Sequence, residues 1–221
     1  MRRSPARAFT PFPDPAETPM APSGRAAETP ALLVIDLERD TLDERKGFPI
    51  TPLARGLLPV VNRLAGRFRA RGWPVVFTTD AFEPGDFLFG GGMAPYSLRG
   101  TAGARVSAEL DLQEGDLWLP KRRFSAFFGT DLAGWLRGRG VTLCAVAGVS
   151  TPFCVLATAL DALSHDFKAV ILEDAAAAPS AARHEALLSV YRRNPLFPLL
   201  RVLTSAALLA ELDAGGEGGA A

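Results

Sequence analysis

The segment Gly148-Val149-Ser150-Thr151-Pro152-Phe153-Cys154 places a thiol where a buried strand is expected to give way to a helix. It follows the apolar run Thr142 to Ala147 and opens an Ala/Leu-rich helical pattern. In the first turn of a helix, unpaired backbone N–H groups and the positive end of the helix dipole favour a thiolate over a thiol. Cys154 is therefore a candidate nucleophile. The alternative is a buried apolar cysteine, which is our interpretation of Cys144.

Two other apolar runs end in charged residues. The run Ala31 to Ile35 stops at Asp36, and the run Leu117 to Leu119 stops at Pro120-Lys121. Only three of the 24 basic residues are lysines, and a lysine offers a compact ammonium whose pKa can shift. Ligands of open parallel sheets bind beyond the carboxyl ends of the strands. We therefore expect this carboxylate and ammonium to converge with the thiol of Cys154.

These three groups suit acyl transfer. An ammonium near a thiol favours the thiolate, and a carboxylate can accept the thiol proton and deliver it to a leaving amine. Attack on an amide carbonyl creates an oxyanion, which backbone N–H groups of the turn Val149 to Cys154 could receive.

The elements that must position these groups alternate between strands and helices. Such alternation predicts βαβ units and a doubly wound, Rossmann-like α/β domain, with a mostly parallel six-stranded sheet and helices on both faces. The expected strands are 31–35, 74–79, 117–119, 142–147, 169–172 and 200–203, and the expected helices are 53–70, 132–137, 154–163, 182–192 and 206–212.

Composition divides the chain into three parts. We expect an extended arm rich in Pro and Ala over residues 1–29, a single domain over residues 30–212 and a flexible Gly-rich tail over residues 213–221. The segment Asp80 to Asp116 is too rich in glycine for a helix and too long for a turn, so we expect it to form one wall of a binding site.

The charge balance and the apolar runs narrow the classes of partner. Lys+Arg and Asp+Glu both number 24, and without a basic stripe we expect no nucleic-acid binding. No run approaches the ~18 apolar residues of a membrane span, and the first residues lack the apolar region of a secretory signal. We expect a cytoplasmic protein with reduced thiols and a small-molecule substrate.

Five segments occur in a recognisable order and spacing: ALLVIDLERD, LRGTAGARV, LPKRRFSAFFGTDL, AGVSTPFCVLATALDAL and AVILEDAAAAPSAARHEALL. Through them, from about Ala31 to Leu212, the chain resembles the isochorismatase-like cysteine hydrolases, which include nicotinamidases and N-carbamoyl amidases. The resemblance implies a catalytic triad of Asp36, Lys121 and Cys154. It also implies a cis peptide bond between Val149 and Ser150, oxyanion-binding N–H groups on Ser150 and Cys154, and a homo-oligomer.

The chain departs from the family at the metal-binding positions. Nicotinamidases hold a metal through an Asp-x-His motif and a further histidine, whereas this chain has Asp80-Ala81-Phe82 and Tyr96 at those places. Its two histidines, His165 and His184, lie in helical patterns far along the chain. We therefore predict no catalytic metal, and no organic cofactor because hydrolysis of a thioester needs none.

The predicted substrate-binding residues are Glu38, Phe82, Tyr96, Arg99 and Thr151. Glu38 stands where the family often has glutamine, and it faces either the pocket, where it could recognise an ammonium or urea N–H, or solvent. Arg99 either holds a substrate carboxylate or organises the long loop. Phe82 and Tyr96 supply aromatic surface, with core packing as the alternative.

Together these features predict a metal-independent cysteine hydrolase of C–N bonds in a small amide, carbamoyl or ureido compound. The alternatives are a vinyl-ether hydrolase of the isochorismatase type, which needs no thiol, and a non-catalytic member of the family.

Overall fold

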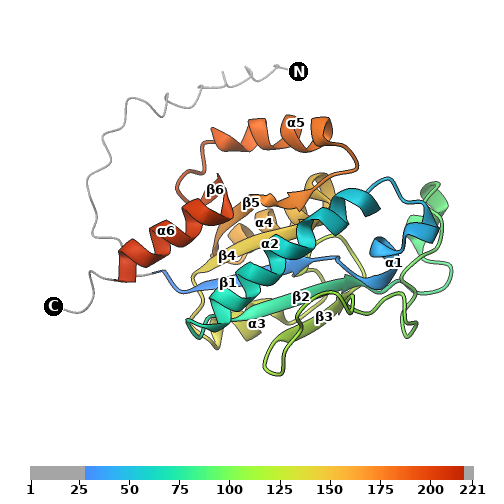
Figure 1. Cartoon of the computed structure of the whole chain (residues 1–221), viewed down its shortest axis with the longest axis horizontal. Helices are drawn as coiled ribbons and strands as arrows, with labels where there is room; N and C mark the ends of the chain where they lie inside the picture. The colour runs from blue at the N-terminus through green and yellow to red at the C-terminus, as the bar shows by residue number, and fades with distance from the viewer. Residues whose placement is uncertain (1–27, 217–221) are drawn as a thin grey trace, which may run out of the picture.

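A computed structural model describes residues 28–216 and contains one sheet of six parallel strands in the order β3-β2-β1-β4-β5-β6 (Figure 1). The chain runs outward from β1 to β3, returns to the other side of β1 and continues to β6, which is the doubly wound arrangement predicted from the sequence. The strands are β1 (Pro30–Ile35), β2 (Val75–Asp80), β3 (Leu117–Lys121), β4 (Leu143–Val149), β5 (Lys168–Ala177) and β6 (Leu200–Leu203).

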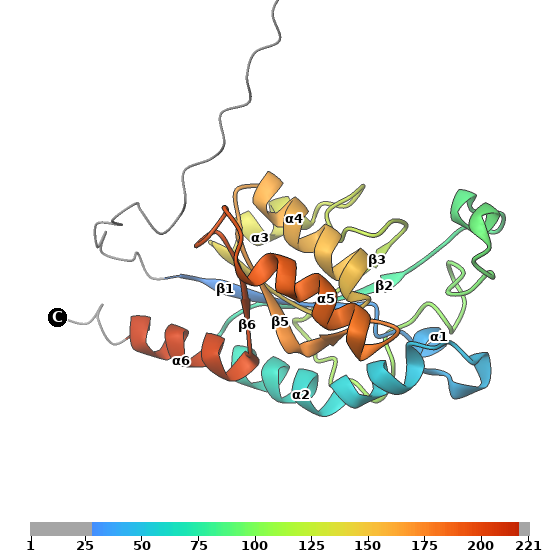
Figure 2. The same cartoon turned by 90° about the horizontal axis from the view of Figure 1, so that it is seen from above.

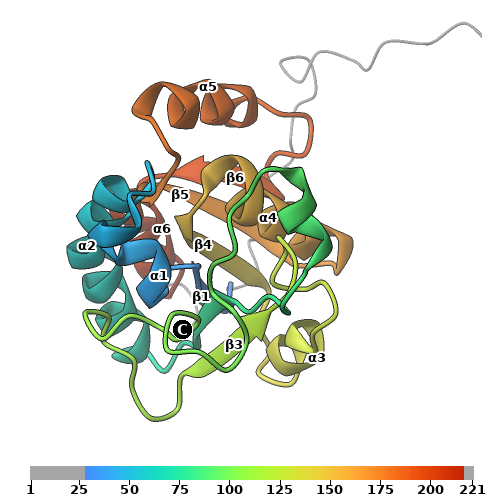
Figure 3. The same ribbon diagram turned by 90° about the vertical axis from the view of Figure 1, so that its right-hand side faces the viewer.

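Helices cover both faces of this sheet. Figures 2 and 3 show α2 and α6 on one face and α3 and α4 on the other, with α5 beside the β6 edge. The helical elements are α1 (Arg39–Leu42), η1 (Glu44–Lys46), α2 (Thr51–Arg69), η2 (Phe87–Gly91), α3 (Leu132–Arg137), η3 (Thr151–Val155), α4 (Leu156–Ser164), α5 (Ala181–Arg192) and α6 (Ser205–Gly216). None of the helices within residues 28–216 has the length and apolar character needed to cross a membrane.

The central strands are buried along their whole length. Every residue of β1, β2 and β4 is buried, as expected for strands covered on both faces. Val61, Leu64 and Phe68 of α2 form part of the core on one face, at the spacing that places them on one side of a helix. Leu132 and Leu136 of α3 belong to the core on the other face.

Gly148 allows β4 to approach β1 closely at the end of the sheet where the site forms. It pairs with Ile35 and has a φ of +104°. A Cβ atom there would lie 2.0 Å from the carbonyl oxygen of Ile35, so only glycine fits. This contact brings the turn that follows β4 next to the residue that follows β1.

The two predicted terminal segments lie mostly outside the described residues. The predicted tail begins inside α6, because that helix continues through Gly216 rather than ending at Leu212. Glu28, the first described residue, pairs with Lys168 at 2.8 Å and with Arg201 at 3.2 Å. The remainder of the predicted arm, residues 1–27, and of the tail, residues 217–221, is not described.

Candidate active site

Neighbouring strands deliver three charged groups to one point at the carboxyl end of the sheet. Asp36 directly follows β1 and adopts a left-handed backbone with φ of +53°, which is uncommon for a residue other than glycine. Asp80 ends β2 and Lys121 ends β3, and the two are partners in the strand register. Pro120 is tolerated beside Lys121 because β3 is an edge strand.

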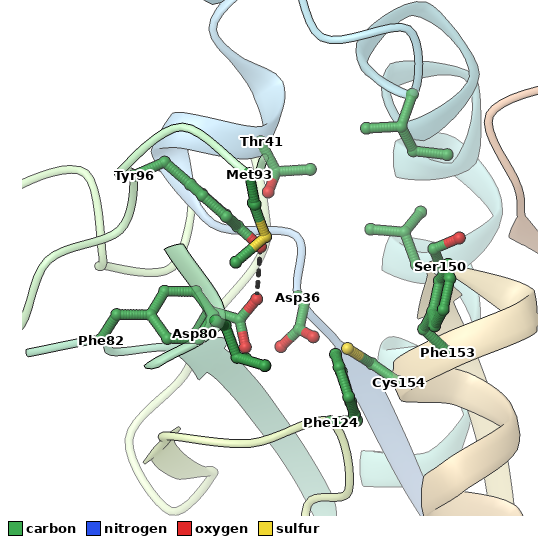
Figure 4. Close-up of a pocket in the computed structure, with 13 residues that line it drawn as sticks. Asp36, Thr41, Asp80, Phe82, Met93, Tyr96, Phe124, Ser150, Phe153 and Cys154 are labelled. Carbon is green, nitrogen blue, oxygen red and sulfur yellow. Dashed lines mark hydrogen bonds between the residues drawn. The ribbon is translucent and has the colours of Figure 1, made fainter. Parts of the chain in front are cut away.

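Lys121 lies between the two carboxylates and close to the sulfur of Cys154. Its Nζ atom is 2.7 Å from Asp36 Oδ2, 2.6 Å from Asp80 Oδ1 and 3.7 Å from Cys154 Sγ. Thr78 donates a hydrogen bond of 3.2 Å to Asp36, and Tyr96 donates one of 2.7 Å to Asp80. The convergence of Asp36, Lys121 and Cys154 predicted from the sequence is present, with Asp80 as a fourth member. Figure 4 shows Asp36, Asp80 and Cys154 of this cluster.

Burial dominates the protonation of this cluster. It raises the pKa of Asp36 to about 7, with the charge of Asp80 adding to the rise and Lys121 opposing it. It lowers the pKa of Lys121, but the charges of Asp36 and Asp80 outweigh this effect and raise that pKa overall. Lys121 is therefore an ammonium at neutral pH, and Asp36 exchanges a proton near neutrality.

The sulfur of Cys154 is a thiol in the resting site. Burial raises the pKa of Cys154 more than the ammonium of Lys121 lowers it. This corrects the thiolate expected from the helix turn, because the sequence does not reveal that the residue is only 8% exposed. Cys144 is fully buried inside β4, as predicted, and burial raises its pKa to about 12.

The cysteine turn η3 is a single wide helical turn before α4. The peptide bond between Val149 and Ser150, which precedes it, is cis. Ser150 lines the cavity beside Cys154, and its buried hydroxyl oxygen has no hydrogen-bond partner within residues 28–216. Wide turns of this kind often occur at functional sites.

A cavity of about 300 Å³ opens above the sulfur. Asp36 and Asp80 reach it from the ends of β1 and β2 and Cys154 from η3, and the long loop after β2 supplies the opposite wall, as predicted (Figure 4). The other lining residues are Thr41, Ile50, Phe82, Leu88, Met93, Tyr96, Phe124, Val149, Ser150 and Phe153.

Phe82 and Tyr96, two of the five predicted substrate-binding residues, line this cavity, and their rings meet edge to face with centroids 5.3 Å apart. The other three do not line it. Arg99 points to Glu83, with 2.6 Å between Nε and Oε1. Thr151 is fully buried against His184, with 2.8 Å between the hydroxyl and Nδ1.

Glu38 faces neither the cavity nor solvent. It is fully buried, and its Oε1 accepts hydrogen bonds from Thr41 at 2.6 Å and Ser97 at 3.1 Å. Its Oε2 has no partner within residues 28–216. Burial, reinforced by the charges of Asp36 and Asp80, raises the pKa of Glu38 well above its usual value. Burial therefore favours the protonated form of Glu38, which does not line the cavity.

Several lining residues were not foreseen from the sequence. Asp80 was recognised only as part of a metal motif, although it ends an apolar run as Asp36 does. Phe124 and Phe153, whose rings lie 5.8 Å apart, each sit within three residues of a predicted catalytic residue. This proximity in the sequence is the feature that could have identified Phe124 and Phe153 as residues of the site. Nothing in the sequence indicates that Met93 faces the cavity.

The residues present do not fit a metal held by histidines. Asp80 already binds Lys121 and Tyr96 through its two oxygens. Phe82 has no donor atom. Asp36, Asp80 and Cys154 do bring possible ligand atoms within 4.8 Å of one another, but the ammonium of Lys121 contacts both carboxylates and supplies the cationic charge between them.

Comparisons with known proteins identify the family to which the chain belongs. The isochorismatase domain matches residues 30–206. A probable inactive nicotinamidase of Arabidopsis thaliana is 33% identical over 71% of this chain and 84% of its own length. A maleamate amidohydrolase of Pseudomonas putida is 33% identical over 72% of this chain and 77% of its own length. An N-carbamoylsarcosine amidase of Thermoplasma acidophilum has a similar structure, with a TM-score of 0.70 and 28% identity over 80% of this chain and 96% of that one. The chain belongs to the isochorismatase-like hydrolase superfamily.

Proposed function

We propose that the protein is a metal-independent cysteine amidohydrolase that cleaves the C–N bond of a small amide, carbamoyl or ureido compound. The observation that supports this most directly is that the thiol of Cys154 and the carboxylate of Asp36, whose pKa is raised to about 7, line one cavity, with the buried ammonium of Lys121 in contact with both. Two of the similar proteins are named as amide hydrolases, which agrees with this chemistry.

In the first half of the reaction the thiol of Cys154 gives its proton to the carboxylate of Asp36. The sulfur bonds to the substrate carbonyl carbon, and the resulting oxyanion is received by the backbone N–H groups of Ser150 and Cys154. Asp36 then passes the proton to the leaving nitrogen, the C–N bond breaks, and ammonia or an amine departs from a thioester.

In the second half Asp36 takes a proton from water, and the oxygen attacks the thioester carbonyl. The C–S bond breaks, the acid leaves, and the sulfur regains a proton from Asp36. One amide and one water give one acid and one amine. Lys121 stays charged throughout, holds Asp36 toward the sulfur and offsets negative charge that develops there.

The test is ammonia release from a panel of small amides, ureides and carbamoyl compounds, with and without a chelator. We expect release by the wild type that is indifferent to chelator and lost in Cys154→Ala, together with alkylation of Cys154 by iodoacetamide. Turnover of a vinyl ether that survives in Cys154→Ala would instead identify the isochorismatase-type reaction. A thiol inert to iodoacetamide and no turnover of any compound would identify a non-catalytic member.

A further inference from the structure

The cavity offers its occupant two carboxylates and no cationic side chain among the described residues that line it. Asp36 and Asp80 face the cavity, whereas Lys121 does not appear on its surface. The Lys121 side chain has no exposed area and contacts both carboxylates. With both acids ionised, one ammonium stands against two negative charges, so the site carries a net negative charge.

The arginines that lie within three residues of Tyr96 and Phe124 in the sequence are paired with carboxylates that do not line the cavity. Arg99 pairs with Glu83 at 2.6 Å. Arg122 and Arg123 both pair with the buried Asp86, at 2.8 Å and 3.1 Å. A carboxylate on the substrate would therefore lose its water without gaining a cationic partner, and an unpaired buried charge is strongly unfavourable.

Apart from Thr41, Tyr96 and Ser150, which carry hydroxyl groups, the rest of the wall is apolar. Phe82 and Tyr96 form one aromatic side, Phe124 and Phe153 form another beside the sulfur, and Met93 also lines the cavity (Figure 4). Aromatic rings and a flexible thioether accommodate flat or irregular apolar groups. Such a lining is typical of sites that bury the apolar body of a small ligand.

We infer that the substrate is an uncharged amide whose acyl group is apolar or aromatic, and that the site rejects amides with a carboxylate on that group. The inference rests on the proposed function for the identity of the reacting bond. It distinguishes this chain from the maleamate amidohydrolase to which it is similar, since maleamate carries a carboxylate.

Matched pairs of amides test the inference. The first pair is 4-methylbenzamide and 4-carbamoylbenzoate, and the second is hexanamide and its analogue with a terminal carboxylate, all assayed at pH 8 so that the acids are ionised. For at least one pair we expect kcat/KM for the uncharged member to exceed that of the anion at least about a hundredfold. Met93→Lys should narrow this ratio at least about tenfold, and Met93→Gln, of similar length and uncharged, should narrow it much less.

Binding separates this inference from the proposed function. The Kd of each compound for Cys154→Ala, measured by calorimetry, should show the same preference although that variant cannot form the thioester. If the uncharged members bind more tightly but the wild type releases no ammonia from them, the proposed function fails and the charge selectivity stands. Equal or tighter binding of the carboxylates overturns the inference, whatever the turnover.

Discussion

Replacing Lys121 by methionine should reveal how strongly the buried ammonium stabilises the two carboxylates. Methionine keeps an unbranched chain of similar length but removes the charge. The lysine side chain is fully buried, and Asp36 and Asp80 beside it are only 4% and 6% exposed. The variant therefore leaves two carboxylates facing each other with no cation between them.

Removing one partner of a buried ion pair costs about 3–5 kcal/mol, which is a large part of the stability of an ordinary domain. With a urea dependence of about 2 kcal/mol per M, the unfolding midpoint should fall by about 2 M at pH 8. In the variant, the pKa of Asp36 in the folded state, already raised to about 7, rises further above its unfolded value because Lys121 no longer lowers it. The stability lost through Asp36 grows as pH rises through its folded pKa, so the deficit should shrink between pH 8 and pH 5.

The assay is equilibrium unfolding in urea at both pH values, with Lys168→Met as the matched control. Lys168 also pairs with a carboxylate, Glu28, but its side chain is 35% exposed, and exposed pairs contribute up to about 1 kcal/mol. Equal losses from the two substitutions, or a Lys121→Met deficit that does not change with pH, would refute the reasoning.

Three further predictions concern the acids of the site. Asp80→Asn should lower the pKa of Asp36 below about 7, since the charge of Asp80 raises it. The acid limb of the pH profile of kcat/KM should therefore move to lower pH. An acid limb that does not move would argue against this coupling between Asp80 and Asp36. Asp36→Asn should lower the pKa of Cys154, because Asp36 raises it. Iodoacetamide should then alkylate Cys154 faster at pH 7, while amide hydrolysis is lost. Slower alkylation would count against this effect of Asp36 on the pKa of Cys154. Glu38→Gln should match the wild type in stability at pH 5 and become progressively more stable than the wild type toward pH 9. The reason is that ionisation of a buried acid with a raised pKa destabilises the wild-type fold. A difference in stability that stays constant with pH would disprove this.

The sequence was sufficient to predict where the reacting groups meet. Asp36, Lys121 and Cys154 each follow an apolar run, and in a doubly wound sheet the ends of such runs gather at one edge. The parallel sheet and the helices on both faces also followed from the alternation of apolar runs, with ends that differ by a few residues, whereas the order of the strands was not predicted. Asp80 obeys the same rule and could have been included.

The predictions that failed concern the directions in which side chains point, which only tertiary contacts fix. Arg99 turns to Glu83 and not to the cavity, and Thr151 turns to His184, which lies 33 residues further along the chain. Neither partner is implied by local pattern. The protonation state of Cys154 also could not be predicted from the sequence. The helix turn favours a thiolate, whereas burial favours the thiol, and the sequence does not quantify burial.

The central claim is that Cys154 becomes acylated during turnover, and the mass of the intact protein quenched within the first turnovers tests it most directly. With an amide found to be a substrate, we expect a mass increase of one acyl group in place of a hydrogen, located on the peptide that contains Cys154, and no increase in Cys154→Ala. Substrate consumption without any such adduct, together with undiminished turnover by Cys154→Ala, would contradict the account.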